Sequence, residues 1–158
     1  MTLSRAFVNE DSSANSAPDL PERPIAPERN LVTPRGLALM EAELERLQKA
    51  YSAELGKDDK TVMAQVMRDL KYWMARRASA ELTRPPVDGT EVRFGHCVTL
   101  ESDKGARSFC IVGLDEADPA AGRLSYISPI ARLLLGKSVG DTVALPQGEA
   151  EITAIRPA

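Results

Sequence analysis

Apolar residues recur at helical spacing in two consecutive stretches within residues 33–83. In the first stretch the steps are three or four residues, through Leu37, Met40, Leu44, Leu47, Tyr51 and Leu55. The second stretch repeats this spacing through Met63, Val66, Leu70, Trp73, Arg77 and Ala80, where Arg77 breaks the apolar register. Steps of this size place the residues on one face of a helix. Because the connection at residues 56–59 is short, the pattern predicts an antiparallel coiled-coil hairpin.

Capping residues agree with these two helices. Thr33 suits an N-cap and Pro34 suits the first helical position, while Gly56 follows the last apolar residue as a C-cap. Asp58 or Asp59 can cap the second helix, where a carboxylate also meets the positive end of the helix dipole. Capping is therefore the first interpretation of these two acids. The alternative is that the adjacent carboxylates share a hard cation such as Mg²⁺.

Residues 91–158 carry the alternation and the turn residues that are typical of short strands. Strands are expected at 91–94, 97–101, 107–112, 123–127, 141–145 and 149–155. One short helix is expected at 129–135, with Ser128 as its N-cap and Pro129 at its first position. One helix laid on an antiparallel sheet makes a small β domain, so the chain is predicted to have an α+β fold.

Two proline-containing segments flank the hairpin. In residues 1–32 a proline recurs every third residue from Pro18 to Pro27, which favours an extended polyproline-like chain. This tail is expected to be mostly disordered, with Ala6-Phe7-Val8 as its one apolar patch that could dock. After the hairpin, Pro85-Pro86 cannot continue a helix, so residues 84–90 are expected to form a short, stiff linker.

Composition narrows the possible classes of function. The net charge of -3 argues against a strongly basic nucleic-acid binder, and the 4% aromatic content argues against a platform that stacks single-stranded bases. No apolar run approaches the roughly 20 residues needed to span a membrane. The first residues also lack the apolar core of a secretion signal. These features favour a cytoplasmic protein.

Few side chains are candidates for catalysis. Cys97 and Cys110 make neither a disulfide framework nor a zinc site, and we interpret them as small buried hydrophobes on strands. His96 is the only histidine, and it is interpreted as a strand residue that faces solvent. Without a second histidine or a serine nucleophile motif, a catalytic triad is not supported.

Several short motifs follow one another in a fixed order between residues 111 and 141. They are Ile111-Val112-Gly113, Asp115-Glu116-Ala117-Asp118, Gly122, Ser128-Pro129-Ile130-Ala131-Arg132, Leu134-Leu135-Gly136-Lys137 and Val139-Gly140-Asp141. Together with Val32-Thr33-Pro34-Arg35-Gly36-Leu37, they resemble the Gre family of bacterial transcript-cleavage factors. The likeness covers residues 31–157. It implies an N-terminal antiparallel coiled coil followed by an FKBP-like C-terminal domain.

The resemblance also implies a partner, bacterial RNA polymerase. The C-terminal domain would sit at the rim of the secondary channel, and the coil would point toward the active centre, with RNA and DNA met only through the transcription complex. Family-level DNA binding is implied only in that indirect sense. The residues that match the family's docking surface are Asp115, Glu116, Ala117, Asp118, Ser128 and Pro129. An acidic loop on rigid strands can pair with a basic or amide-rich rim. The alternative that Asp115 and Asp118 only form turns stays open. We expect a monomer.

The tip of the hairpin departs from the family pattern. The cleavage factors carry Leu-Gly-Asp-x-Ser-Glu-Asn-Ala, whose Asp and Glu help hold the polymerase's second Mg²⁺. Aligning on Leu55-Gly56 places Lys57 and Lys60 at those two positions, and a shift by one residue places Asp58 and Thr61 there. Neither register restores the acidic pair. The resemblance therefore implies a non-cleaving relative, such as the short-coiled regulators of nucleoside diphosphate kinase.

Two other functions stay in competition with this one. The first is active stimulation of cleavage through Asp58 and Asp59, which would contact a Mg²⁺ shared with the polymerase active site. No cofactor is expected to bind the chain stably. The second is a prolyl isomerase built on the FKBP-like domain, although this domain offers only Phe94, Phe109 and Tyr126 as aromatic lining. In the favoured interpretation the chain is not an enzyme, because the polymerase would perform any RNA cleavage.

Overall fold

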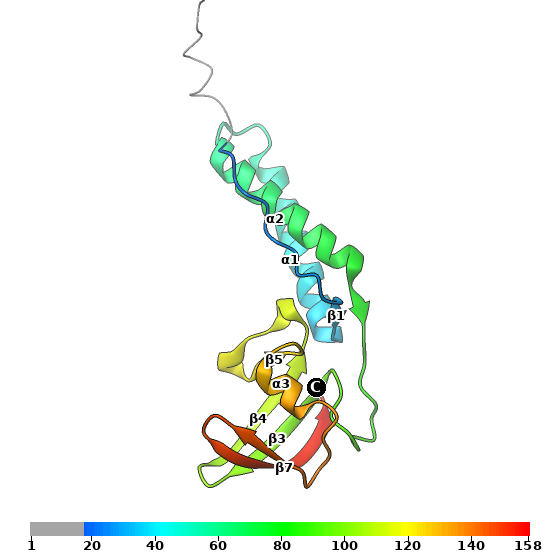
Figure 1. Ribbon diagram of the computed structural model, residues 1–158. Helices are drawn as coiled ribbons and strands as arrows, with labels where there is room; N and C mark the ends of the chain where they lie inside the picture. Colours follow the sequence, from blue (N-terminus) through cyan, green and yellow to red (C-terminus); the bar gives the residue numbers. More distant parts are fainter. Residues whose placement is uncertain (1–17) are drawn as a thin grey trace, which may run out of the picture.

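A computed structural model describes residues 18–158 as a helical hairpin standing on a small β domain (Figure 1). Helices α1 (Pro34–Glu54) and α2 (Lys60–Ser79) lie side by side and run in opposite directions. Both predicted helix starts are confirmed. The Thr33 side chain accepts a hydrogen bond from the Gly36 amide at 2.9 Å, and Asp59 accepts one from the Val62 amide at 3.1 Å. The supercoiling of a true coiled coil stays a prediction.

The chain segments that enter and leave the hairpin are joined to each other. Strand β1 (Leu31–Val32) pairs in parallel with strand β2 (Glu81–Leu82). The amide of Glu81 donates to the carbonyl of Asn30 at 2.8 Å, and the amide of Thr83 donates to the carbonyl of Val32 at 2.9 Å. Both ends of the hairpin are therefore fastened at its base.

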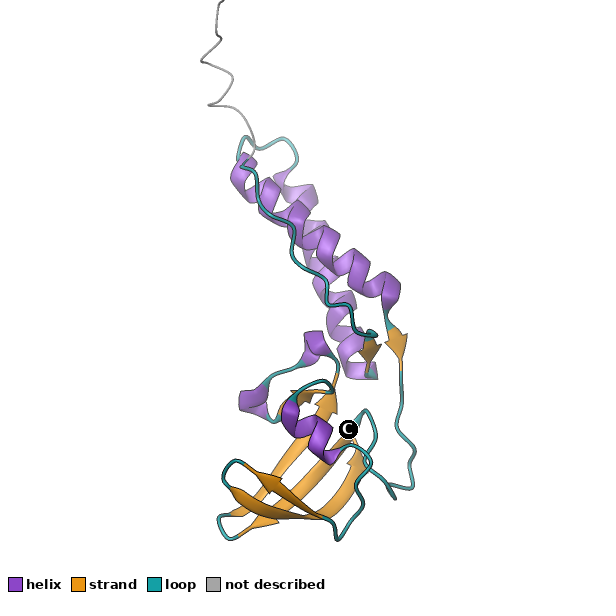
Figure 2. Cartoon of the chain, viewed as in Figure 1, coloured by secondary structure: helices purple, strands orange, loops and turns teal. Residues whose placement is uncertain are grey.

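Residues 18–30, which we call the N-terminal strap, run along the hairpin toward this base (Figure 2). Arg23 pairs with Asp69 at 3.2 Å, and its guanidinium lies 3.9 Å from the ring centroid of Tyr72. Glu22 pairs with Lys71. The expectation of a disordered tail is therefore wrong for residues 18–32, because cation–π and ionic contacts with α2 supply the interactions that its few apolar residues do not. The apolar patch at residues 6–8 lies outside the described residues.

The β domain is a single five-stranded sheet in the order β5-β4-β3-β7-β6. The strands are β3 (His96–Ser102), β4 (Gly105–Val112), β5 (Arg123–Ser125), β6 (Thr142–Leu145) and β7 (Gly148–Pro157). The sheet is mixed, which corrects the prediction of a purely antiparallel one, because β5 runs parallel to β4. Two 3₁₀ turns, η2 (Leu114–Glu116) and η3 (Pro119–Ala121), carry the chain back between these strands.

The predicted first strand, at residues 91–94, does not form. This segment instead contacts the loop after the short helix, because the backbone of Val92 forms hydrogen bonds with the backbone of Gly136 and Lys137. Two such bonds fix Val92 in the core without making a ladder. The prediction therefore identified the apolar residues of this segment correctly but wrongly assigned its backbone to a strand.

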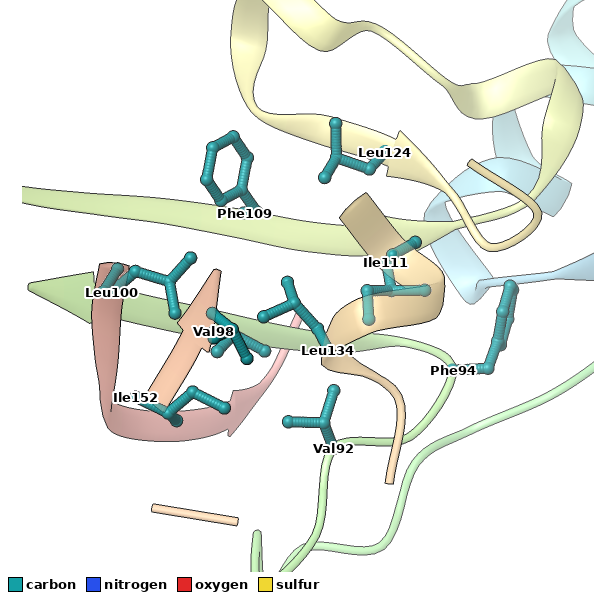
Figure 3. Packing of buried hydrophobic residues seen from close by; sticks show 12 residues of the cluster. Val92, Phe94, Val98, Leu100, Phe109, Ile111, Leu124, Leu134 and Ile152 are labelled. Atoms are coloured by element: carbon teal, nitrogen blue, oxygen red, sulfur yellow. The ribbon is translucent and has the colours of Figure 1, made fainter. Parts of the chain in front are cut away.

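Helix α3 (Pro129–Leu134) covers one face of the sheet and closes the core (Figure 3). Leu134 points toward the sheet residues Val98 and Ile111, and all three are fully buried. Because side chains alternate along a strand, Cys97, Cys110 and Arg123 lie on the opposite face of the sheet. The α+β fold is thus observed, whereas the FKBP-like likeness stays a prediction.

Candidate functional site

Asp115, the first acid of the predicted docking loop, faces the hairpin base. The Arg76 Nε donates to one carboxylate oxygen of Asp115 at 2.6 Å, and the hydroxyl of Tyr72 donates to the other oxygen. The side chain of Arg76 is only 2% exposed. Burial, followed by the hydrogen bond to Asp115, raises the pKa of Tyr72 to about 12.

Arg76 also links this loop to the N-terminal strap. Its Nη2 donates to the side-chain oxygen of Asn30 at 2.7 Å, and the side-chain amide of Asn30 donates to the Arg76 carbonyl at 2.7 Å. Asn30, Tyr72, Arg76 and Asp115 therefore form one bonded set, which we call the base network. The network connects the strap, α2 and the β domain.

Glu116, the second acid, is docked against the first turn of α1. It accepts a hydrogen bond from the Thr33 hydroxyl at 2.5 Å and pairs with Arg35 at 3.1 Å. Its side chain is 4% exposed. A carboxylate at this place is stabilised by the positive end of the helix dipole. Glycine at position 36 leaves it room, since a Cβ there would lie 2.7 Å from a Glu116 oxygen.

The other four residues of the predicted docking surface are more accessible. Asp118 has a side chain that is 50% exposed and a long contact of 3.4 Å with Arg123. Pro129 is exposed, whereas Ala117 and Ser128 are partly buried, and Ser128 accepts from the Ala131 amide as the cap of α3. The structure thus separates the six residues. Asp115 and Glu116 hold the loop, while Asp118 and Pro129 face solvent.

The tip of the hairpin carries the second predicted site. Asp59 is occupied as the N-cap of α2, and Lys57 pairs with Glu54 at 3.0 Å. Asp58 is exposed and has no hydrogen-bond or ionic partner within residues 18–158. Over the same residues, no cluster of three or more His, Cys, Asp or Glu side chains could hold a metal ion. The tip acids therefore do not by themselves fit a complete Mg²⁺ site.

Two interpretations of single residues need correction. His96 is fully buried and does not face solvent, because its ring accepts from the Arg93 amide at 2.9 Å and bonds the Pro86 carbonyl at 2.9 Å. Cys97 and Cys110 are joined in a disulfide between β3 and β4. A signal for this pair existed in the sequence. The two cysteines are equally distant from the Asp103-Lys104 turn, which places them opposite each other in a hairpin.

The three aromatic residues considered for an isomerase site belong to the core. Phe94 and Phe109 are buried, and Tyr126 packs against the cluster with its ring nearly perpendicular to that of Phe94. The Tyr126 hydroxyl donates to the Arg29 carbonyl at 2.6 Å. These aromatics therefore hold the domain together and fasten the strap to it. Across residues 18–158, no helix has the length and apolarity that crossing a bilayer requires.

Comparisons with known proteins place the chain among transcription elongation factors. The family model described as "Transcription elongation factor, GreA/GreB, C-term" matches residues 87–157. GreA of Vibrio parahaemolyticus is 35% identical over 137 residues, covering 72% of this chain and 86% of that protein. GreA of Rhodospirillum rubrum is 31% identical over 152 residues, covering 79% and 96%. The chain belongs to the GreA/GreB family of transcription elongation factors.

One solved structure that is similar to this chain is GreA factor homolog 1 (Gfh1) of Thermus thermophilus. It is 19% identical, with 81% of this chain and 99% of that chain covered at a TM-score of 0.38. A superposition this loose supports no statement about the fold or the function of this chain.

Proposed function

We propose that this protein binds bacterial RNA polymerase at the rim of the secondary channel and modulates elongation with weak or no stimulation of transcript cleavage. Membership of the GreA/GreB family supports the partner. The observation that supports a low cleavage activity lies at the tip. In the register that aligns Leu55-Gly56, Lys57 and Lys60 stand at the positions of the family's metal-holding acids, and a shift by one residue places Asp58 and Thr61 there, so neither register restores the acidic pair. Asp59 caps α2.

The electrostatics of the tip support this proposal. A factor that helps to hold a second Mg²⁺ must bring negative charge to the ion, because Mg²⁺ binds through carboxylates and water. Here Asp58 is the one tip acid left without a bonded partner in the described residues, and one exposed carboxylate brings less negative charge to the ion than the family's acidic pair. With a weakly held metal, the attacking water is not activated.

Polymerase docking is assigned to the exposed part of the acidic loop and the start of α3. Asp118 and Pro129 would contact the rim directly, with Ala117 and Ser128 beside them. Asp115 and Glu116 would act indirectly, since their bonds to Arg76 and Thr33 fix the loop against the hairpin. The same bonds set the direction in which the hairpin enters the channel.

Binding is tested with purified core polymerase and a titration of the labelled protein, competed by a cleavage-active GreA. We expect competition for one site and several-fold weaker binding after Asp118→Ala. Asp103→Ala is the matched control, because Asp103 is an exposed acid on the turn between β3 and β4. That turn lies at the end of the sheet away from the hairpin (Figure 1). The absence of binding at micromolar concentration would remove the proposal.

Cleavage is tested separately on backtracked elongation complexes. We expect the natural chain to shorten the transcript no faster than polymerase alone. The double variant Lys57→Asp with Lys60→Glu should gain activity, whereas Lys49→Asp on the exposed side of α1 should not. If the natural chain cleaves efficiently and Asp58→Ala with Asp59→Ala abolishes this, the alternative of an active cleavage factor replaces our proposal.

A further inference from the structure

The disulfide lies in a row of four residues across the outer face of the sheet. Arg156 on β7 is opposite Cys97 on β3, Cys97 is opposite Cys110 on β4, and Cys110 is opposite Arg123 on β5. Residues that are directly opposite point to the same face of a sheet. An arginine therefore stands on each side of the cysteine pair on this face of the sheet.

These two arginines are poorly neutralised. Arg156 is exposed and has no hydrogen-bond or ionic partner within the described part of the chain. Arg123 has only the 3.4 Å contact with Asp118, and its buried Nε has no hydrogen-bond partner there. On this face the two arginines beside the disulfide therefore carry positive charge that is only partly neutralised.

A cavity of about 590 Å³ opens onto the same disulfide. It lies between the base of α1, the linker and the sheet, and both cysteines line it. Three arginines also line it, namely Arg35, Arg84 and Arg123. Glu116 neutralises Arg35, but Arg84 is exposed and has no partner among residues 18–158, so the lining side chains carry net positive charge. The remaining wall includes Pro34, Pro85 and Val112.

We propose that Cys97–Cys110 is a site of thiol–disulfide exchange whose reductant is a small anionic thiol that enters this cavity. Access selects for size, because Cys97 is only 6% exposed and the cavity has the volume of a small-molecule site. Charge selects for an anion, because the guanidinium groups of Arg84 and Arg123 belong to residues that line the cavity and attract negative charge. Neither argument depends on polymerase binding, so this proposal stands or falls apart from the proposed function.

The exchange proceeds in two displacements. The thiolate of the small thiol attacks one sulfur, the S–S bond breaks, and the other cysteine leaves as a thiolate that the neighbouring guanidiniums stabilise. A second small thiolate then attacks the small-thiol sulfur of the mixed disulfide, which releases the small disulfide and leaves the second cysteine as a thiolate. Two small thiols thus supply the two electrons, and their two protons end on the cysteines.

The test compares three thiols of similar size and different charge on the full-length oxidised protein. They are 2-mercaptoethanesulfonate, 2-mercaptoethanol and 2-mercaptoethylamine. Free cysteines are trapped by alkylation and counted by mass spectrometry, and each rate is divided by the rate of the same thiol on an uncharged reference disulfide. This ratio removes differences in intrinsic nucleophilicity. We expect the sulfonate to react several-fold faster than the neutral thiol and the amine to react slowest. The spread should shrink as salt screens the charges.

Variants then assign the effect to the cavity. Arg84→Gln on the exposed linker and Arg123→Gln on β5 should each reduce the preference for the anion by about two-fold to three-fold at low salt. Arg46→Gln, whose arginine pairs with Glu43 on α1, should leave it unchanged. Equal normalised rates for the three thiols would overturn the proposal. So would an unchanged preference in both cavity variants, or two free thiols in the air-equilibrated protein.

Discussion

The base and the tip of the hairpin both present a pair of neighbouring acids, and the structure uses the two pairs in different ways. At the base, Asp115 and Glu116 each accept hydrogen bonds from two side chains and are largely buried. At the tip, Asp59 accepts one backbone hydrogen bond and Asp58 lies in solvent. An acidic pair in a sequence is therefore available for an external partner only where the fold leaves its carboxylates unbonded.

The largest expected effect comes from breaking the base network. Asp115→Ala leaves the buried charge of Arg76 without its carboxylate, and loss of one partner of a buried pair costs ~3–5 kcal/mol. We expect the free energy of unfolding in urea to fall by that amount. Asp118→Ala removes an exposed acid from the same loop and should cost less than ~1 kcal/mol. Equal losses for the two variants would contradict the difference drawn between them.

A smaller loss is expected from the second acid of the base. Glu116→Gln keeps the shape of the side chain but removes the charge that Arg35 and the first turn of α1 stabilise. Charge-assisted hydrogen bonds contribute ~1.5–3 kcal/mol, so a loss in that range is expected in urea unfolding. Glu149→Gln, on an exposed position of β7, is the control and should change the stability by less than ~0.5 kcal/mol.

The free energy of unfolding should also depend on pH above about 10, through Tyr72 in the base network. Its pKa is raised to about 12 in the folded protein, against an ordinary value of 10.0, so the folded state keeps the proton over that interval while the unfolded state loses it. This contribution to stability is complete below pH 10 and is lost as the pH rises through about 12. Urea unfolding of the natural protein and of Tyr72→Phe should show a difference that narrows between these two pH values. A difference that stays constant would contradict the assignment.

The smallest effects are expected at the tip. Asp59→Ala removes the N-cap of α2 and should cost ~1 kcal/mol, whereas Asp58→Ala should change the stability by less than ~0.5 kcal/mol. Urea unfolding of the two single variants makes this comparison. A larger loss for Asp58→Ala than for Asp59→Ala would show that the two acids had been assigned the wrong way round.

Features set by local chemistry could be predicted from the sequence, whereas long-range pairings could not. Thr33 and Asp59 cap their helices as expected, because a cap depends on residues only a few positions away. By contrast, Glu116 bonds Thr33 across 83 positions of the chain, and nothing in the local pattern indicates it. The helical spacing drew attention to Arg77, which is exposed, while the buried arginine is its neighbour Arg76.

The strap and the outer face of the sheet were missed for related reasons. A segment with many prolines and few apolar residues has the composition of a disordered chain, yet Arg23 and Asn30 fasten it through rings, charges and backbone groups. The hydrophobic pattern describes only the buried face of the sheet. It carries no information about which polar or sulfur-bearing residues meet on the other face, and this face holds the row from Arg156 to Arg123.

Because β1 and β2 hold both ends of the hairpin at its base, a small rotation at the base would displace the tip by a much larger distance. α1 contains 21 residues, which at 1.5 Å per residue gives an arm of about 31 Å. A tilt of only about 5° at the base would move the far end by roughly 3 Å over such an arm. The contacts of Asn30 and Arg76 at the base therefore influence the position of the tip residues, although they do not touch them.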